Sequence, residues 1–119
     1  MEKTHRVLSK ILNNIPVLIL EGDITSEVDS DIMNAYRELK EKHSPFYLII
    51  DFNKTKYINS AGIATLINII QDLGDFGGKV VFTGLSQHFQ KVMDIVGITD
   101  FVNIYQTNEE ALKNIETKA

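Results

Sequence analysis

The hydrophobic residues of this chain follow two alternating patterns: short continuous runs, and longer segments with a helical repeat. Short runs are typical of strands, and an uninterrupted run is expected where both faces of a sheet are covered. The sequence therefore predicts five strands, at residues 5–12, 17–20, 46–50, 79–83 and 101–105. Glu21-Gly22-Asp23 is expected to end the second strand, and Asp51 to end the third.

Four further segments repeat their hydrophobic residues at helical spacing, as Ile63, Leu66 and Ile70 do. Each begins near a Ser or Thr, whose side chain accepts a hydrogen bond from an N–H group of the first helical turn. The expected capping residues are Thr25 or Ser26, Ser60, Ser86 and Thr107. Glycines at 77–78 and at 97 are expected to end the second and third helices.

The order of these elements, β-β-α-β-α-β-α-β-α, predicts an α/β fold with about four helices and a mixed, mostly parallel sheet. Asn13-Asn14 suits a tight turn, because asparagine tolerates positive φ. The first strand is therefore expected to pair antiparallel with the second at one edge of the sheet. The 119 residues contain no linker or repeat, so one domain over residues 1–119 is expected.

Composition narrows the classes of function. The chain has 12 Lys and Arg against 16 Asp and Glu, a formal net charge of −4, which argues against direct binding to nucleic acid or to an anionic membrane surface. No hydrophobic run approaches the roughly 20 residues of a membrane helix. The absence of cysteine excludes disulfides, thiolate metal sites and cysteine nucleophiles, and it suits a cytoplasmic protein.

The loop at residues 51–60 carries the most informative candidate, Ser60. In open α/β sheets, functional loops lie at the carboxyl ends of the strands. Ser60 either caps the following helix or accepts a phosphoryl group, which adds about −1.5 to −2 charge. The positive end of the helix dipole tolerates that charge, and the small neighbours Ala61 and Gly62 leave the hydroxyl open to a kinase.

The stretch at residues 51–63, which ends Tyr57-Ile58-Asn59-Ser60-Ala61-Gly62-Ile63, resembles the signature of anti-sigma factor antagonists, the STAS domain family. Four more segments resemble the family in order and spacing. They are Leu20-Glu21-Gly22-Asp23-Ile24-Thr25, Gly77-Gly78-Lys79-Val80-Val81, Asp94-Ile95-Val96-Gly97-Ile98-Thr99-Asp100-Phe101 and Glu109-Glu110-Ala111-Leu112. The resemblance covers nearly the whole chain and implies a STAS-like fold.

The resemblance also implies a regulatory binding protein that is a substrate and not an enzyme. Family antagonists bind an anti-sigma factor with serine kinase activity and so regulate transcription by partner switching. The kinase phosphorylates a serine at the start of the second helix, the complex is lost, and a serine phosphatase restores it. Ser60 matches that serine, and no cofactor or metal is implied. The implied partner-binding residues are Asp23, Thr25, Asn59, Ala61, Gly62 and Ile63.

Three positions depart from the family pattern. Asn59 stands where the best-known members have Asp, which removes a charge beside Ser60. Ala61 replaces a frequent second serine, so that Ser60 is the only candidate hydroxyl at this helix start. Thr25 stands where several members carry Asp, so this part of the partner surface is altered as well.

Two alternatives remain open. One is a non-switching STAS scaffold or ligand-sensing module in which Ser60 is only a cap. The other is an enzyme or a receiver-like domain in which Glu21, Asp23 and Asp51 bind Mg²⁺ and Asp51 accepts a phosphoryl group.

Other polar residues carry weaker signals. Lys54 and Lys56 flank the Ser60 loop and could steer an acidic partner, but solvation of the loop is favoured, because surface charges usually contribute little. The histidines have no metal-ligand spacing, so surface or packing roles are expected for His5, His43 and His88.

Overall fold

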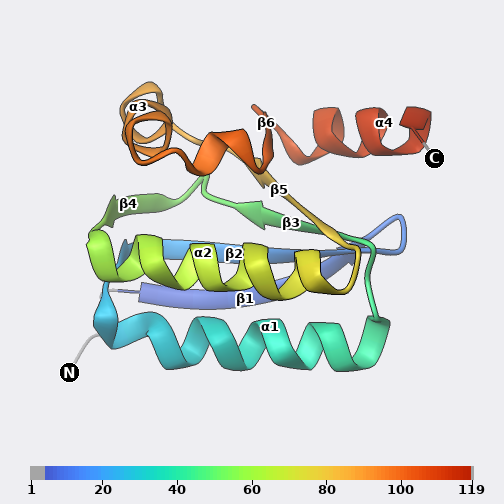
Figure 1. Cartoon of the computed structure of the whole chain (residues 1–119), viewed down its shortest axis with the longest axis horizontal. Coiled ribbons are helices and arrows are strands. Elements are labelled where there is room, and N and C mark those ends of the chain that lie inside the picture. Colours follow the sequence, from blue (N-terminus) through green and yellow to red (C-terminus); the bar gives the residue numbers. More distant parts are fainter. Residues whose placement is uncertain (1–4, 119) are drawn as a thin grey trace.

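The computed structural model describes residues 5–118 of the chain (Figure 1). Its strands are β1 (His5–Leu12), β2 (Ile15–Ile24), β3 (Tyr47–Asp51), β4 (Thr55–Ile58), β5 (Lys79–Thr83) and β6 (Asn103–Tyr105). Its helices are α1 (Asp29–His43), α2 (Ser60–Asp75), α3 (Gln87–Val96) and α4 (Asn108–Lys118), with short 3₁₀ turns η1 (Ser26–Val28) and η2 (Ile98–Asp100).

The six strands form one mixed sheet in the order β1-β2-β3-β5-β6, and β4 pairs with β2 beyond the end of β3. β1 is antiparallel to β2, and the turn between them places Asn13 and Asn14 at φ of 51° and 67°. The remaining pairings are parallel. The α/β class, the antiparallel edge strand and the mostly parallel sheet predicted from the sequence are thereby confirmed.

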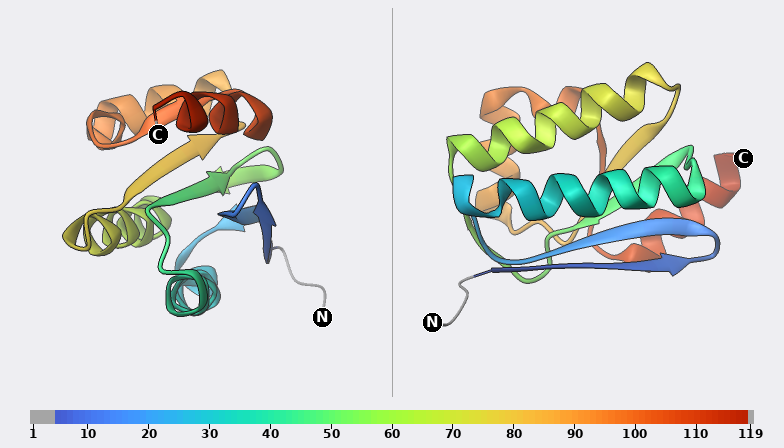
Figure 2. Two further views of the ribbon diagram at one scale, coloured as in Figure 1. Left: turned by 90° about the vertical axis from the view of Figure 1, so that its right-hand side faces the viewer. Right: turned by 90° about the horizontal axis from the view of Figure 1, so that it is seen from below.

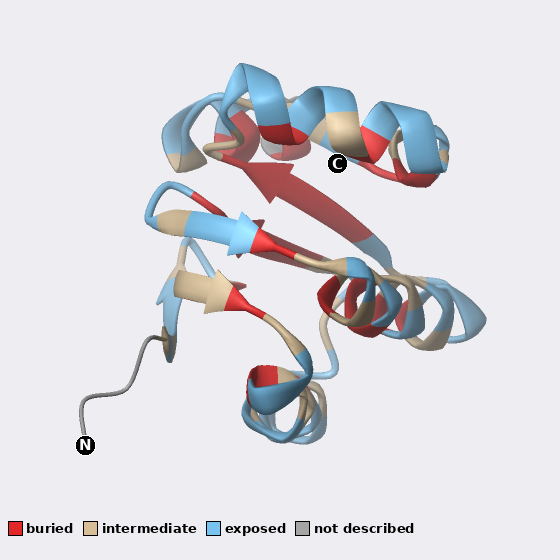
Figure 3. Cartoon of the chain, turned by 90° about the vertical axis from the view of Figure 1, so that its left-hand side faces the viewer, coloured by how far each residue is buried: buried red, intermediate tan, exposed pale blue. Residues whose placement is uncertain are grey.

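Helices cover both faces of the sheet, as the end-on view of Figure 2 shows. The larger core lies between the sheet and α1, α2 and α3, and its largest fully buried side chains include Tyr36, Phe52 and Phe82. The smaller core lies beneath α4 and contains Val17, Ile49 and Val81 with Ala111, Leu112 and Ile115. Figure 3 shows the buried residues in the strands and on the helix sides that face them.

β2 is longer than expected, and this changes the neighbourhood of Ser60. Glu21-Gly22-Asp23 does not end the strand; Gly22 has φ of +87°, and the register shifts between Gly22 and Asp23. At this bulge β2 leaves β3 and pairs with β4, a segment that the sequence predicts to be part of a loop. β4 was missed because it has four residues, two of them exposed, and therefore no hydrophobic run.

Two strand bounds and one helix start also differ from expectation. The third strand covers Tyr47–Asp51, and the last begins only at Asn103. Thr25 caps the 3₁₀ turn η1 by accepting a hydrogen bond from Glu27 N at 3.3 Å, and α1 starts three residues after the first residue of that turn.

None of the helices between residues 5 and 118 is long and apolar enough to cross a membrane.

Candidate functional site

The start of α2 lies beside the end of β2, at the carboxyl edge of the sheet. Ile24 of β2 is in register with Ile58 of β4, and Asn59 N–H donates to the Ile24 carbonyl with 3.1 Å between N and O. Because β4 runs directly into α2, the loop after β2 and the first helical turn become neighbours. The structure thereby brings together the two sequence-distant groups of predicted partner-binding residues.

Asn59, and not Ser60, caps α2. The backbone of Asn59 is extended (φ −108°, ψ −177°), and its Oδ1 accepts a hydrogen bond from Gly62 N at 3.0 Å. The Asn59 carbonyl accepts the first intrahelical bond, from Ile63 N at 3.0 Å. The expected cap by Ser60 is therefore wrong: asparagine caps as well as serine does, and the extended backbone that a cap requires falls one residue earlier.

Ser60 is the first helical residue, and its side chain is exposed. Within residues 5–118 its hydroxyl has no hydrogen-bond partner. The first turn of α2 carries no acidic residue, so no negative charge already offsets the positive end of the helix dipole there, although the Gly62 N–H is bonded to Asn59. A phosphoryl group at Ser60 would therefore meet favourable charge and would displace no existing hydrogen bond.

Gly62 sets how closely α2 approaches the sheet. It is buried, and a Cβ atom at this position would lie 2.5 Å from the Ile24 carbonyl oxygen and 2.9 Å from Ile58 Cγ1. Only a residue without a side chain fits there. Burial also changes the role assigned from the sequence: Gly62 acts in packing, because a buried backbone offers no surface to a partner.

The other predicted partner-binding residues are at least partly exposed. Asp23 is in register with Tyr57 of β4, and Thr25 follows β2 directly. Asn59, Ala61 and Ile63 belong to the first turn of α2 or its cap. We call the set the switch surface, and it consists of Asp23, Thr25, Asn59, Ser60, Ala61 and Ile63.

A buried threonine ties this first turn to α1, which sequence reasoning missed. Thr65 Oγ1 lies 2.5 Å from Asp29 Oδ1 and 3.1 Å from the Ala61 carbonyl oxygen, and Thr65 is 2% exposed. The available signal was a single hydroxyl residue within the hydrophobic stripe of α2. Asp29 opens α1, so this contact fixes the two helix starts relative to each other.

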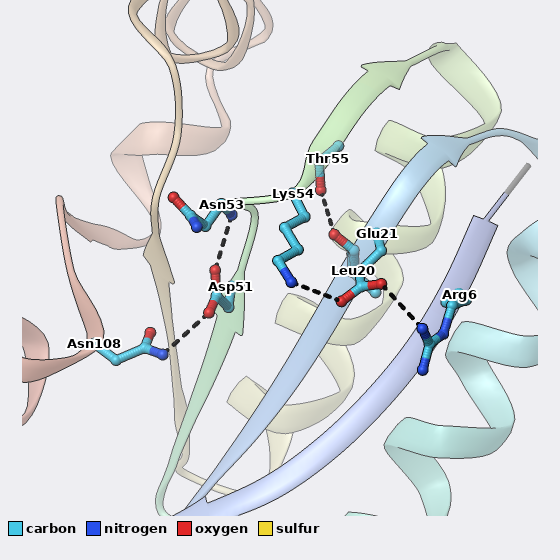
Figure 4. Close-up of polar contacts among 8 residues, drawn as sticks. All are labelled: Arg6, Leu20, Glu21, Asp51, Asn53, Lys54, Thr55 and Asn108. Carbon is cyan, nitrogen blue, oxygen red and sulfur yellow. Dashed lines mark hydrogen bonds and ion pairs between the residues drawn. The ribbon is translucent and has the colours of Figure 1, made fainter.

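Two of the three carboxylates of the receiver-like alternative, Asp51 and Glu21, take part in separate interactions (Figure 4). Asp51 accepts hydrogen bonds from Asn53 N at 2.8 Å and from Asn108 Nδ2 at 3.1 Å. Glu21 instead lies 3.9 Å from Arg6 Nη1 and 3.8 Å from Lys54 Nζ. Among the described residues, no group of three or more His, Asp or Glu side chains is placed to hold a metal ion.

The histidines have separate surroundings. His5 Nε2 lies 3.2 Å from Asp31 Oδ2, which joins β1 to α1. The ring of His88 packs against Phe89, with 5.9 Å between the ring centroids. His43 is the exposed last residue of α1.

Comparison with known proteins supplies a family match and a set of structural neighbours. Residues 6–111 match the family model of the STAS domain. An anti-sigma factor antagonist from Mycobacterium paratuberculosis is 19% identical, with a TM-score of 0.83 over 94% of each chain. The Bacillus protein SpoIIAA in its phosphorylated form is 16% identical, with a TM-score of 0.71 over 93% of this chain and 98% of that one.

A third neighbour, an anti-sigma-factor antagonist (STAS) domain protein from Planctomyces limnophilus, is 15% identical, with a TM-score of 0.77 over 91% of this chain and 95% of that one. At these identities the structural likeness establishes a shared fold. The family match rests on the sequence of residues 6–111.

Proposed function

The chain belongs to the STAS domain family, and from this premise we propose that it is an anti-sigma factor antagonist switched off by phosphorylation of Ser60. In this proposal, unphosphorylated protein binds an anti-sigma factor that has serine kinase activity. The observation that carries the proposal is that the Ser60 hydroxyl is exposed and has no hydrogen-bond partner within residues 5–118. It is free because Asn59, and not Ser60, caps the helix.

The proposed reaction takes place at Ser60 Oγ and is catalysed by the partner. Ser60 Oγ attacks the γ-phosphorus of ATP bound to the kinase, ADP leaves, and the hydroxyl proton passes to a base of the kinase. The chain supplies the nucleophile and its position but no catalytic group, so it acts as a substrate. A serine phosphatase then hydrolyses the phosphoserine and restores the hydroxyl.

Phosphorylation is expected to change binding without unfolding the protein. The phosphoryl group adds about −1.5 to −2 charge in the middle of the switch surface. A charge buried in an interface without a partner group costs desolvation and repulsion, so the complex weakens. The cap at Asn59 and the Thr65–Asp29 contact do not involve Ser60 Oγ, so the helix start persists. The proposed consequence is reversible control of sigma-factor release in the cytoplasm.

The proposal is tested by incubating the protein with ATP and the serine kinase encoded nearest to it, and then measuring intact mass. One phosphoryl group is expected on the wild-type protein and on Ser26→Ala, a matched control that removes another exposed serine. No gain is expected for Ser60→Ala. Stable kinase binding without any phosphorylation would instead favour the non-switching module, and phosphorylation at Asp51 from acetyl phosphate and Mg²⁺ would support the receiver-like alternative.

A second variant separates binding from folding. Ser60→Asp places a negative charge at the first helical position, where acidic residues are favourable. It is therefore expected to keep the wild-type melting temperature and to bind the kinase at least about tenfold more weakly. A tenfold change corresponds to roughly 1.4 kcal/mol of binding free energy. Loss of folding in Ser60→Asp would show that Ser60 is structural.

A further inference from the structure

A concentration of positive charge lies at the other end of β4 from Ser60. A hollow of about 460 Å³ is lined there by the cationic side chains of Arg6, Lys54 and Lys56, with Glu21 as the acidic residue among its lining residues. These three cations exceed the one carboxylate by two charges, although the whole chain carries a formal net charge of −4. We call Arg6, Lys54 and Lys56 the basic edge.

Glu21 leaves most of the hydrogen-bonding capacity of the basic edge unused. Its two partners, Arg6 Nη1 and Lys54 Nζ, lie 3.9 and 3.8 Å away, beyond ordinary hydrogen-bond distance. The Arg6 and Lys54 side chains are 67% and 69% exposed, whereas that of Glu21 is 19% exposed. Figure 4 shows Arg6 approaching Glu21 from β1, and Lys54 approaching it from the turn that precedes β4. The unsatisfied donors therefore face solvent.

The basic edge is continuous with the switch surface. β4 runs from Thr55 to Ile58 and leads directly into Asn59 and Ser60. Its four residues span roughly 13 Å at the rise of a strand. The intervening Tyr57 is 53% exposed and belongs to a residue type enriched in protein interfaces. A partner that covers about 800 Å² on this chain, a disc roughly 16 Å in radius, reaches both surfaces when it sits over Ser60.

The exposure of these cations indicates a macromolecular partner and not a small molecule. Small-ligand sites enclose about 70–90% of the ligand surface and are lined mainly by apolar side chains. The side chains of this hollow are polar or charged, and two of its three cations are about two-thirds exposed. Exposed cations attract an acidic surface over a distance and set its orientation, which raises the rate of association.

We propose that the basic edge receives an acidic segment of the anti-sigma factor and steers that partner onto Ser60. This inference rests on the proposed function, and it assigns Lys54 and Lys56 a steering role in place of the solvation of the loop that the sequence favoured. The predicted chemistry of the partner is a cluster of Asp and Glu beside its serine-binding active site. The effect of the basic edge belongs to association and not to the phosphoryl transfer itself.

The test measures association rate constants of the kinase with the full chain at two salt concentrations. Lys54→Glu/Lys56→Glu is compared with Lys42→Glu/Lys79→Glu, which makes the same change of net charge at exposed lysines at the end of α1 and the start of β5. Lys54→Gln/Lys56→Gln removes the charges without placing a new carboxylate beside Glu21, so it remains informative if the reversal disturbs the loop. Melting curves accompany all variants.

At low salt, the charge reversal at Lys54 and Lys56 is expected to lower the association rate constant roughly tenfold and to flatten its salt dependence. The glutamine variant is expected to show an intermediate loss, and the control a change of less than about twofold. KM for phosphorylation of Ser60 should rise while kcat stays the same.

Two other outcomes separate this inference from its premise. If the wild-type protein binds the kinase and the basic-edge variants associate as fast as the control, the basic edge has no steering role and the proposed function stands. If the wild-type protein does not bind the kinase at all, the proposed function fails and this inference fails with it.

Discussion

The two ends of α2 are attached to the rest of the molecule in different ways. At its start, α2 is held by backbone hydrogen bonds, by the cap at Asn59 and by the missing side chain of Gly62. Near its end, Asp72 accepts hydrogen bonds from Tyr36 Oη at 2.6 Å and from Lys40 Nζ at 2.8 Å. The same Lys40 Nζ lies 3.7 Å from the centroid of the Phe76 ring.

The two ends also differ in electrostatics. The hydrogen bonds from Lys40 and Tyr36 lower the pKa of Asp72 below its usual value. Burial raises the pKa of Tyr36, and the neighbouring Asp72 carboxylate raises it further. The end of α2 is therefore held by the Lys40–Asp72 ion pair, whereas at its start the described residues form no ion pair and the Asp29 carboxylate contacts the uncharged hydroxyl of Thr65. This difference lets a charge be added at Ser60 without disturbing any ion pair that holds the helix.

The largest expected effect of a single substitution concerns Gly62. Gly62→Ala places a methyl group 2.5 Å from the backbone oxygen of Ile24, which cannot move aside as a flexible side chain would. We expect it to lower the free energy of unfolding by about 2 kcal/mol, the usual cost of overpacking. Urea denaturation measures this change.

Gly74→Ala is the matched control within the same helix. A Cβ atom at Gly74 meets nothing within 4 Å, so only the helix propensity changes. We expect an increase in the free energy of unfolding of about 0.5–1 kcal/mol. Equal effects of the two substitutions would show that the close approach of α2 to β2 is not what positions Ser60.

The next effect concerns the far end of α2. Tyr36→Phe removes the hydrogen bond to Asp72 from a side chain that is 1% exposed. We expect a loss of about 1–2 kcal/mol in the free energy of unfolding, because the lost bond is made to a charged acceptor. Phosphorylation of Ser60 by the kinase should continue at the wild-type rate, since the start of α2 is held independently. A parallel loss of phosphorylation would contradict that independence.

Acidification tests the same end of the helix. Because the pKa of Asp72 is lower in the folded state than its usual 3.8, the stabilisation is present above that value and is lost as the pH falls through the folded-state pKa. The wild-type protein should therefore be more stable than Asp72→Asn near neutral pH, and the difference should shrink as the pH falls through 3.8 toward the lower pKa of the folded state. A difference that does not change with pH would contradict the assignment.

The elements with a hydrophobic repeat could be predicted from the sequence, and those held by local geometry could not. The alternation of strands and helices along the chain, the antiparallel pairing of β1 with β2 through the turn at Asn13-Asn14, and α3 with its cap Ser86 follow from patterns of residue type. The Ser86 cap is confirmed by the bond from Phe89 N at 3.1 Å. β4 escaped prediction because its pairing depends on a register shift at Gly22, which no periodicity reveals.

The sequence indicated which segments form the candidate site, but it did not indicate which residue caps α2 or which residues of the first turn are buried. Residue type could not decide between Asn59 and Ser60 as the cap, since both side chains serve equally well. The choice is made by the bond from Asn59 N to the Ile24 carbonyl, a contact between residues 35 positions apart that holds Asn59 at the end of β4. The same long-range pairing determines that Gly62 is buried and that Ser60 is exposed.

The smallest expected effect separates these two neighbours directly. Asn59→Ala removes the side chain that accepts from Gly62 N, and we expect a loss of about 1 kcal/mol in the free energy of unfolding. Ser60→Ala removes an exposed hydroxyl with no hydrogen-bond partner within residues 5–118, so its effect should stay within about 0.5 kcal/mol. Thermal and urea unfolding of the two variants measure both values. A larger loss of unfolding free energy in Ser60→Ala than in Asn59→Ala would show that Ser60 is the cap. A hydroxyl engaged in capping would not be free to attack ATP.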